Sequence, residues 1–231
     1  SVSTIEHLMA VFYGEGIDNI LIEIDAPEVP IMDGSAFEFV EAIRSVGTEE
    51  QNCEKKFIKV INKIEIKEGP KYISIEPLAN DLIVDFEIVY KNQLIRTRRK
   101  EFKLSNGDLT SIYNSKTFCL YEDIDKIKSL GLAKGGSLEN AIVVSDNKIL
   151  NEDGLRYRDE FVNHKILDCL GDLMLTGYRI FGRIKTSQGG HQLTNELLKK
   201  FLSDKSNWKF ESFTAKDQKD STLQRSIAVN A

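Results

Sequence analysis

The amino-acid pattern predicts an α+β fold made of two layered, sandwich-like domains packed together. Before Cys53 the residues indicate a helix, a strand and a helix, whereas after Cys53 several strand-like segments precede the strongest helix. Strands followed by helices are typical of α+β domains, while a regular alternation of the two would indicate a parallel α/β sheet. The region 51–55 is the best candidate linker, so one domain is expected in residues 1–52 and the other in residues 53–231.

The first predicted domain opens with a helix. Apolar residues recur there at helical spacing, Ser3 or Thr4 suits the N-cap, and Gly14 and Gly16 end the pattern. Apolar and polar residues then alternate over 17–25, which predicts a strand. A second helix is expected over 36–46, after a turn that contains aspartate, glycine and serine.

The second predicted domain begins with strand-like segments that are expected to form a β-meander. These strands are expected at 57–66, 71–76, 82–90 and 96–104. Later elements are a short helix at 124–130, a strand at 141–144, a turn at 151–154, a helix at 156–176, a strand near 178–184 and a helix at 192–202. The polar tail beyond Phe213 is expected to be loosely ordered.

Composition excludes several classes of protein. The net charge of -5 argues against a general nucleic-acid binder, which would carry excess Lys and Arg. Three widely spaced cysteines without a CxxC pair favour neither a disulfide framework nor a cysteine zinc site, so a reducing cytoplasm is expected. No apolar run reaches the roughly 18 residues of a membrane span. Because the chain starts at Ser1 without a signal-like segment, we expect a fragment whose first domain is N-terminally incomplete.

Three histidines, His7, His164 and His191, are the only ones in the chain, and acidic residues lie near each of them. His164 and Asp168 are spaced i, i+4 on the strongest predicted helix, so both side chains leave one face and can chelate one ion. A catalytic zinc takes three protein ligands and keeps one position open, which makes His7 the natural third ligand. The spacing alone also suits a solvated polar pair.

Four further residues have both a catalytic and an ordinary interpretation. Glu6 suits a general base beside a metal, but the helix dipole favours any glutamate in a first turn. Asp172 continues the His-Asp helix face, either as a solvated residue or as a support for an imidazole. His191 follows two glycines at a helix start and is either a catalytic acid or a structural cap. Lys165 either positions a phosphate or is simply solvated.

Longer strings, taken together and in order, resemble the UDP-3-O-acyl-N-acetylglucosamine deacetylase family of bacterial lipid A synthesis. The strings are STIEHLMA (3–10), GIDN (16–19), PIMDGSA (30–36), NEDGLR (151–156), DEFVNHKILD (159–168) and GH (190–191). The resemblance runs from residue 1 to about residue 203. It implies a zinc site, although two imidazoles and a carboxylate also suit Fe2+. The site residues that it implies are the metal ligands His7, His164 and Asp168, the general base Glu6, the catalytic His191 paired with Asp172, and Thr117 as an oxyanion donor.

Substrate contacts follow from the same resemblance. The family has a β-α-β insertion that forms an apolar passage for an acyl chain, and residues 119–150 are similar to it. Phe118, Ile124, Leu132, Ala141 and Val143 are the residues that we expect in contact with that chain. Lys165 is similar to the lysine that contacts the substrate phosphate, and Lys71 and Tyr90 fall near positions that handle the nucleotide.

The resemblance implies a cytoplasmic, monomeric enzyme of Gram-negative bacteria whose substrate is a UDP-linked, acylated amino sugar. Hydrolysis of the acetamide would release acetate and a free amine. Three alternatives remain. The chain could be another metal-dependent amidase, such as a peptidase or a different sugar deacetylase, a fragment of the family that has lost activity, or an α+β protein whose histidines are structural. A long apolar passage would favour the acylated sugar over a peptide.

Overall fold

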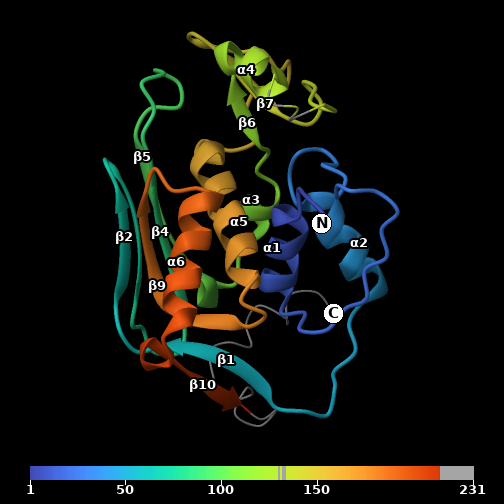
Figure 1. The fold of residues 1–231 in the computed structure, drawn as a ribbon. Helices are drawn as coiled ribbons and strands as arrows, with labels where there is room; N and C mark the ends of the chain where they lie inside the picture. The colour runs from blue at the N-terminus through green and yellow to red at the C-terminus, as the bar shows by residue number, and fades with distance from the viewer. Residues whose placement is uncertain (130, 132–133, 214–231) are drawn as a thin grey trace.

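The protein has a mixed α+β architecture, seen in a computed structural model that describes residues 1–129, 131 and 134–213. Seven strands form one sheet and three form another. Helices α5 (Glu160–Met174) and α6 (His191–Ser203) lie against the large sheet, and α1 (Glu6–Glu15) and α2 (Phe37–Val46) lie beyond them (Figure 1). The predicted α+β class is confirmed, while the division at residues 52 and 53 stays a prediction. No helix among the described residues has the length and apolarity that a membrane span needs.

Strand β9 (Arg179–Ser187) organises the large sheet. It pairs in parallel with β1 (Lys55–Val60) and β4 (Leu82–Ile88), and antiparallel with β3 (Lys71–Glu76). The outer strands are β2 (Ile64–Glu68) against β3, β5 (Arg98–Lys103) against β4, and β10 (Trp208–Phe213) against β1. The predicted meander is therefore wrong, because a strand from late in the chain separates β3 from β4.

The predicted single strand at 57–66 is two strands, β1 and β2. The backbone turns away from β1 at Ile61 and Asn62, whose N–H groups both donate to the carbonyl oxygen of Asn207. Local alternation of side chains continues through the break, but the hydrogen bonds to a distant residue interrupt the ladder. Apolar periodicity alone could not reveal this break, since Asn207 lies far away in sequence.

The predicted strand at 17–25 is also wrong. This segment forms no strand and has no pairing partner among the described residues, and the side chains of Ile20, Leu21, Ile22 and Ile24 are exposed, with Leu21 at 85%. A strand needs a neighbour that satisfies its backbone groups, and the described part of the chain places none beside it. The predicted N-cap is wrong as well: Ile5 precedes α1 without a side-chain cap, and the Thr4 hydroxyl donates to Glu28 Oε1 instead.

The remaining helices agree with the pattern. Helices α2, α5, α6 and the short α4 (Ile124–Ser129) lie where apolar periodicity placed them, and Gly154 closes the predicted turn by donating to Asn151. Strand β6 (Phe118–Leu120) lies at the start of the β-α-β insertion that was expected over 119–150. Elements that were not predicted are β8 (Lys148–Ile149), β10, α3 (Thr110–Tyr113) and three 3-10 turns at Leu104–Asn106, Tyr121–Asp123 and Lys205–Asn207. Two of the predictions fall outside the described residues: the loosely ordered tail beyond Phe213, and Leu132 as a contact of the acyl chain.

A second, three-stranded sheet stands at one end of the molecule (Figure 1). Strand β6 pairs in parallel with β7 (Ile142–Ser145), α4 lies between them in the chain, and β8 pairs antiparallel with β7. These elements form a β-α-β unit followed by a short hairpin. Gly34 contacts the segment before β7 so closely that a Cβ there would lie 1.8 Å from the carbonyl oxygen of Asn140. Its φ of +84° also favours glycine.

Helix α5 runs through the core and carries the close contact that builds the site. Its apolar side chains, including Phe161 and Leu167, are fully buried. At Gly171 a Cβ would lie 2.1 Å from the carbonyl oxygen of Glu6, so the first turn of α1 lies directly on α5. The absence of a side chain at residue 171 therefore lets His7 reach the ligand-bearing face of α5.

Candidate active site

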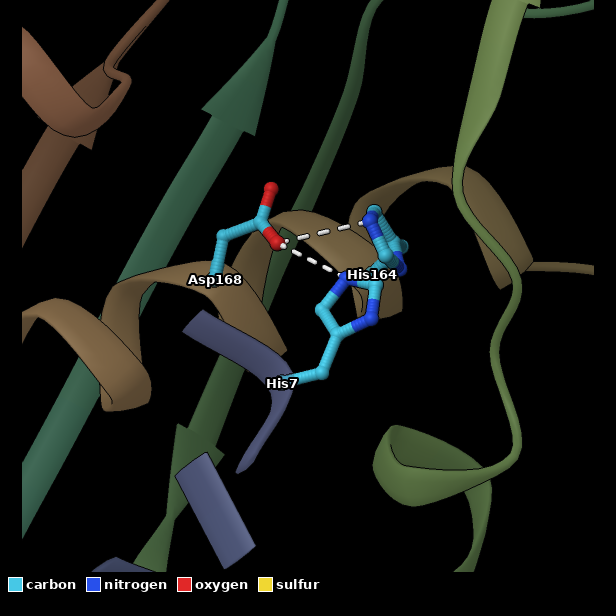
Figure 2. A group of neighbouring side chains, drawn as sticks. All are labelled: His7, His164 and Asp168. Atoms are coloured by element: carbon cyan, nitrogen blue, oxygen red, sulfur yellow. Dashed lines mark ion pairs between the residues drawn. The ribbon is translucent and has the colours of Figure 1, made fainter. Parts of the chain in front are cut away.

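Three buried side chains from two helices converge at the contact between α1 and α5. His7, His164 and Asp168 each offer a ligand atom, and these atoms all lie within 4.8 Å of one another. Asp168 Oδ1 is 3.3 Å from His164 Nε2 and 3.7 Å from His7 Nε2 (Figure 2). The imidazole rings are nearly perpendicular, at 85°, with centroids 5.0 Å apart. This arrangement aims two nitrogens and one oxygen at a common point.

The donor set fits a divalent cation. Asp168 Oδ1 is buried and has no hydrogen-bond partner among the described residues, so neither imidazole contact satisfies it. Leaving a buried polar atom unpaired costs about 1–3 kcal/mol, more when it is charged, and a bound cation would remove that cost. Two imidazole nitrogens and one carboxylate oxygen are a common ligand set of catalytic zinc. We therefore find that these residues fit the metal.

Hydrogen bonds orient two of the three ligands. His164 Nδ1 lies 3.0 Å from the Ser115 carbonyl oxygen, and because a carbonyl only accepts, Nδ1 carries the proton. The lone pair of Nε2 then faces the convergence point. Lys165 Nζ donates to Asp168 Oδ2 at 2.9 Å and leaves Oδ1 free to bind.

Charge states in the cluster suit metal binding. Complete burial lowers the pKa of His164 to about 4, although Asp168 opposes the shift, so the imidazole is neutral at pH 7. Burial acts to raise the pKa of Asp168, but His164 and Lys165 together hold it well below its usual range. Burial lowers the pKa of Lys165, and the carboxylate of Asp168 outweighs it, so the net shift is upward. The site thus presents a neutral imidazole and a carboxylate.

A second constellation lies beside the first. His191 begins α6, and its Nδ1 lies 2.8 Å from Asp172 Oδ1, while its Nε2 lies 3.9 Å from Glu6 Oε1. The hydrogen bond with Asp172 raises the pKa of His191 to about 9, against the opposing effect of burial. At neutral pH this imidazole therefore holds a proton, as a general acid must.

An apolar cavity of about 400 Å³ lies between β6, α4 and β7. Among the residues that line it are Thr117, Phe118, Ile124, Ala141 and Val143. All five were expected at the active site or in contact with an acyl chain. The structure thus places them around one space.

Phe118 connects the cavity to the metal cluster. Its ring lies 4.9 Å from that of Phe161 on α5, and Lys165 Nζ lies 5.8 Å from its centroid. The ring of Tyr90 lies 5.7 Å away, and burial raises the pKa of this tyrosine. Lys71 opens β3 and is exposed, and no hydrogen bond or ion pair of the described residues joins it to the other candidates.

Sequence reasoning missed three residues that build the site: Ser115, Glu160 and Gly171. The contact of Ser115 uses its backbone carbonyl, which leaves no mark on residue type. Glu160 did carry a signal, because it precedes His164 by four residues on the same helix face. A glycine inside a strong helical pattern was the available signal for Gly171.

Comparison with known proteins gives the family of this chain. The family model LpxC, described as UDP-3-O-acyl N-acetylglycosamine deacetylase, matches residues 1–203. A UDP-3-O-acyl-N-acetylglucosamine deacetylase of Histophilus somni is 46% identical over 220 residues, which cover 94% of this chain and 72% of that protein. Proteins of the same name from Haemophilus influenzae strain 86-028NP and Pasteurella multocida are each 44% identical, over 94% and 93% of this chain and 72% and 71% of their own lengths. The chain therefore belongs to the UDP-3-O-acyl-N-acetylglucosamine deacetylase family of enzymes.

Proposed function

We propose that this protein hydrolyses the acetamide of UDP-3-O-acyl-N-acetylglucosamine in a Zn2+-dependent reaction, in the cytoplasm of a Gram-negative bacterium. The products are acetate and UDP-3-O-acyl-glucosamine, and the reaction is the committed step of lipid A synthesis. The observation that carries the proposal is the unsatisfied Oδ1 of Asp168, buried opposite two imidazole nitrogens. Fe2+ suits the same ligands, so elemental analysis decides the metal.

The metal ligands would be His7, His164 and Asp168. Zn2+ bound there would lower the pKa of a water molecule and polarise the acetamide carbonyl. Glu6 lies next to the first ligand in the chain and is partly exposed, so its carboxylate is placed to accept the proton of the attacking water. Thr117, on the cavity wall, would donate to the oxygen on which negative charge develops.

His191 supplies the proton that the reaction needs at its end. The imidazolium form, which Asp172 stabilises, offsets negative charge in the transition state. Cleavage of the C–N bond then requires a proton on the leaving nitrogen, and His191 Nε2 is the donor because Nδ1 is held by Asp172. The distance of 3.9 Å from His191 Nε2 to Glu6 Oε1 supports this assignment of a neighbouring acid and base.

Binding of the rest of the substrate follows from the surrounding surfaces. The cavity of about 400 Å³ would hold the acyl chain, which is an argument for a long apolar substituent and against a peptide substrate. Lys165 would reach a substrate phosphate with its remaining N–H donors, since only one is needed for Asp168. Lys71 and Tyr90 are proposed for the nucleotide end.

The test is the release of acetate from UDP-3-O-acyl-N-acetylglucosamine by the purified chain, measured before and after treatment with a chelator. We expect release that stops after chelation and returns when Zn2+ is added back. UDP-N-acetylglucosamine, which lacks the acyl chain, serves as the matched substrate control and should react far more slowly. Undiminished release from protein that elemental analysis shows to be free of metal would refute the metal dependence, and no release from the metal-loaded chain would refute the activity.

A further inference from the structure

Glu160 is a buried carboxyl group that the proposed reaction does not use. It is the first residue of α5, its side chain is inaccessible to solvent, and no ion pair to it occurs among the described residues. Instead it accepts backbone N–H groups: Oε1 accepts from Lys116 at 3.0 Å, and Oε2 accepts from Arg156 at 2.5 Å and Tyr157 at 3.3 Å. Burial of a carboxyl group is costly unless its oxygens are hydrogen-bonded, and here both are.

The residue on either side of Lys116 serves the candidate site. The Ser115 carbonyl accepts from His164 Nδ1, and Thr117 lines the apolar cavity. This segment has no regular secondary structure of its own, since it connects α3 to β6. Its conformation therefore depends on individual hydrogen bonds. The Ser115 hydroxyl donates to the Ser111 carbonyl at 2.6 Å, and Lys116 N–H donates to Glu160.

Other contacts hold the two ends of the same segment. Thr117 N–H donates to the Gly34 carbonyl at 2.7 Å, and the Arg156 guanidinium donates to the Asn114 carbonyl at 3.0 Å. Neither bond fixes the peptide plane between Ser115 and Lys116, because both lie beyond it. The N–H of Lys116 belongs to that very plane, as does the Ser115 carbonyl. Glu160 thus controls the direction in which this carbonyl points.

Glu160, His164 and Asp168 lie at successive i, i+4 positions on α5, so they share one helix face. The helix that carries two ligands therefore also carries the group that orients one of them. We propose that Glu160 is a positioning residue for the metal centre, which holds the Ser115 carbonyl against His164 and Thr117 against the cavity. The role rests on the proposed metal dependence. Glu160 would act on the metal centre through the 115–117 segment, without being a ligand itself.

The experiment replaces Glu160 by glutamine in the full chain and measures Co2+ binding. Glutamine has nearly the same shape, but its NH2 group would face a backbone N–H donor, so the Ser115–Lys116 peptide would shift. Partners that orient a metal-binding histidine are worth about 10- to 100-fold in metal affinity. We expect E160Q to bind Co2+ at least tenfold more weakly, with a changed visible absorption spectrum of the bound ion, which reports ligand geometry.

Asp81 offers a matched control. It is also a buried carboxyl group that accepts backbone N–H groups, from Leu82 and Ser105, but it joins β4 to the turn after β5, away from the ligands. D81N should lower thermal stability without any change in the affinity or spectrum of Co2+. A role of Glu160 in stability alone would give E160Q the same result as D81N.

A second variant, E160D, covers the case in which E160Q does not fold. Aspartate keeps both acceptor oxygens but is one methylene shorter. The Co2+ affinity of E160D should therefore lie between those of the wild type and E160Q. If E160Q does not fold, the affinity of E160D is compared with the wild type and should be lower. Wild-type affinity and spectrum in whichever variants fold would overturn the positioning role while the metal site stands. Absence of Co2+ binding by the wild-type chain would overturn both the metal site and this role.

Discussion

The Nδ1 atom of His191 lies 2.8 Å from Oδ1 of Asp172, and the hydrogen bond between them raises the pKa of the imidazole. His191 comes from the start of α6 and Asp172 from the last turns of α5, so the packing of these two helices creates the pair. The side chain of His191 remains half exposed, with Nε2 directed toward Glu6. The pair thus joins a charged imidazole to a site that is open to substrate.

Replacement of Asp172 by asparagine should lower the pKa of His191 from about 9 toward the ordinary value of 6.5. Because the neutral amide no longer stabilises the imidazolium, the alkaline limb of turnover should move to lower pH. NMR titration of the His191 ring and the pH profile of acetate release both measure this shift. E196Q, which removes an exposed carboxylate from the same helix, is the control and should leave the pKa near 9. A pKa that stays near 9 in D172N would contradict the assigned cause.

The same pair makes stability depend on pH, with a defined sign. The pKa of His191 is raised in the folded state, so folding binds this proton more tightly than the unfolded chain does. Its contribution is complete below pH 6.5 and is lost as the pH rises through about 9. Thermal unfolding between pH 6 and pH 10 should therefore show a loss of stability in the wild type that is smaller in D172N. Equal losses in the two proteins would argue against the linkage.

Substitutions of the metal ligands and of the general base should differ in their effects on bound metal. H164A and D168A each remove one donor from a three-donor site, so we expect loss of bound metal together with loss of turnover. E6Q keeps all three donors, and we expect it to retain metal while turnover falls by about 10²- to 10⁴-fold. Elemental analysis and initial rates of acetate release on the same preparations measure both quantities. Stoichiometric metal in both ligand variants would show that the site lies elsewhere.

Local pattern predicted the helices of this fold well, but it did not predict strand pairing. Helix α5 could be placed because its apolar period depends only on neighbouring residues. The central position of β9 could not, since it depends on contacts with β1 and β4 at distant places in the sequence. The segment 17–25 shows the opposite error, because alternation is necessary for a half-buried strand and does not supply a partner.

Some residues of the candidate site could likewise be predicted from local sequence, and others could not. Helical spacing predicted that His164 and Asp168 share a face, and the structure shows both pointing to one place. No spacing rule links His7 to a helix more than 150 residues away, so it was only a candidate third ligand until the family resemblance supported it. Contacts made by backbone atoms, such as the Ser115 carbonyl, are invisible to any argument from residue type. The three-dimensional position of the 115–117 segment was therefore beyond reach.

A large side chain in the apolar cavity should discriminate between acyl chains. Ala141 lines the cavity, so A141W would displace part of a long chain. Exclusion of about two methylenes, at about 0.8 kcal/mol each, should raise KM for a long-chain substrate about tenfold and leave short-chain substrates nearly unaffected. V46W provides the control, because Val46 is 84% exposed on α2. Equal effects of A141W on short and long substrates would place the acyl chain outside this cavity.

Gly171 should be intolerant of even one additional carbon. Its Cβ in G171A would lie 2.1 Å from the carbonyl oxygen of Glu6, which is backbone and cannot rotate away. Alanine gains about 1 kcal/mol of helix propensity over glycine, whereas overpacking costs about 1–3 kcal/mol, so we expect net destabilisation. The first turn of α1 must move, and His7 moves with it. The free energy of metal binding should therefore change more than the free energy of unfolding. G135A, where a Cβ meets nothing within 4 Å, should change neither urea unfolding nor metal binding. Wild-type metal affinity in G171A would show that the contact between α1 and α5 does not position the ligand.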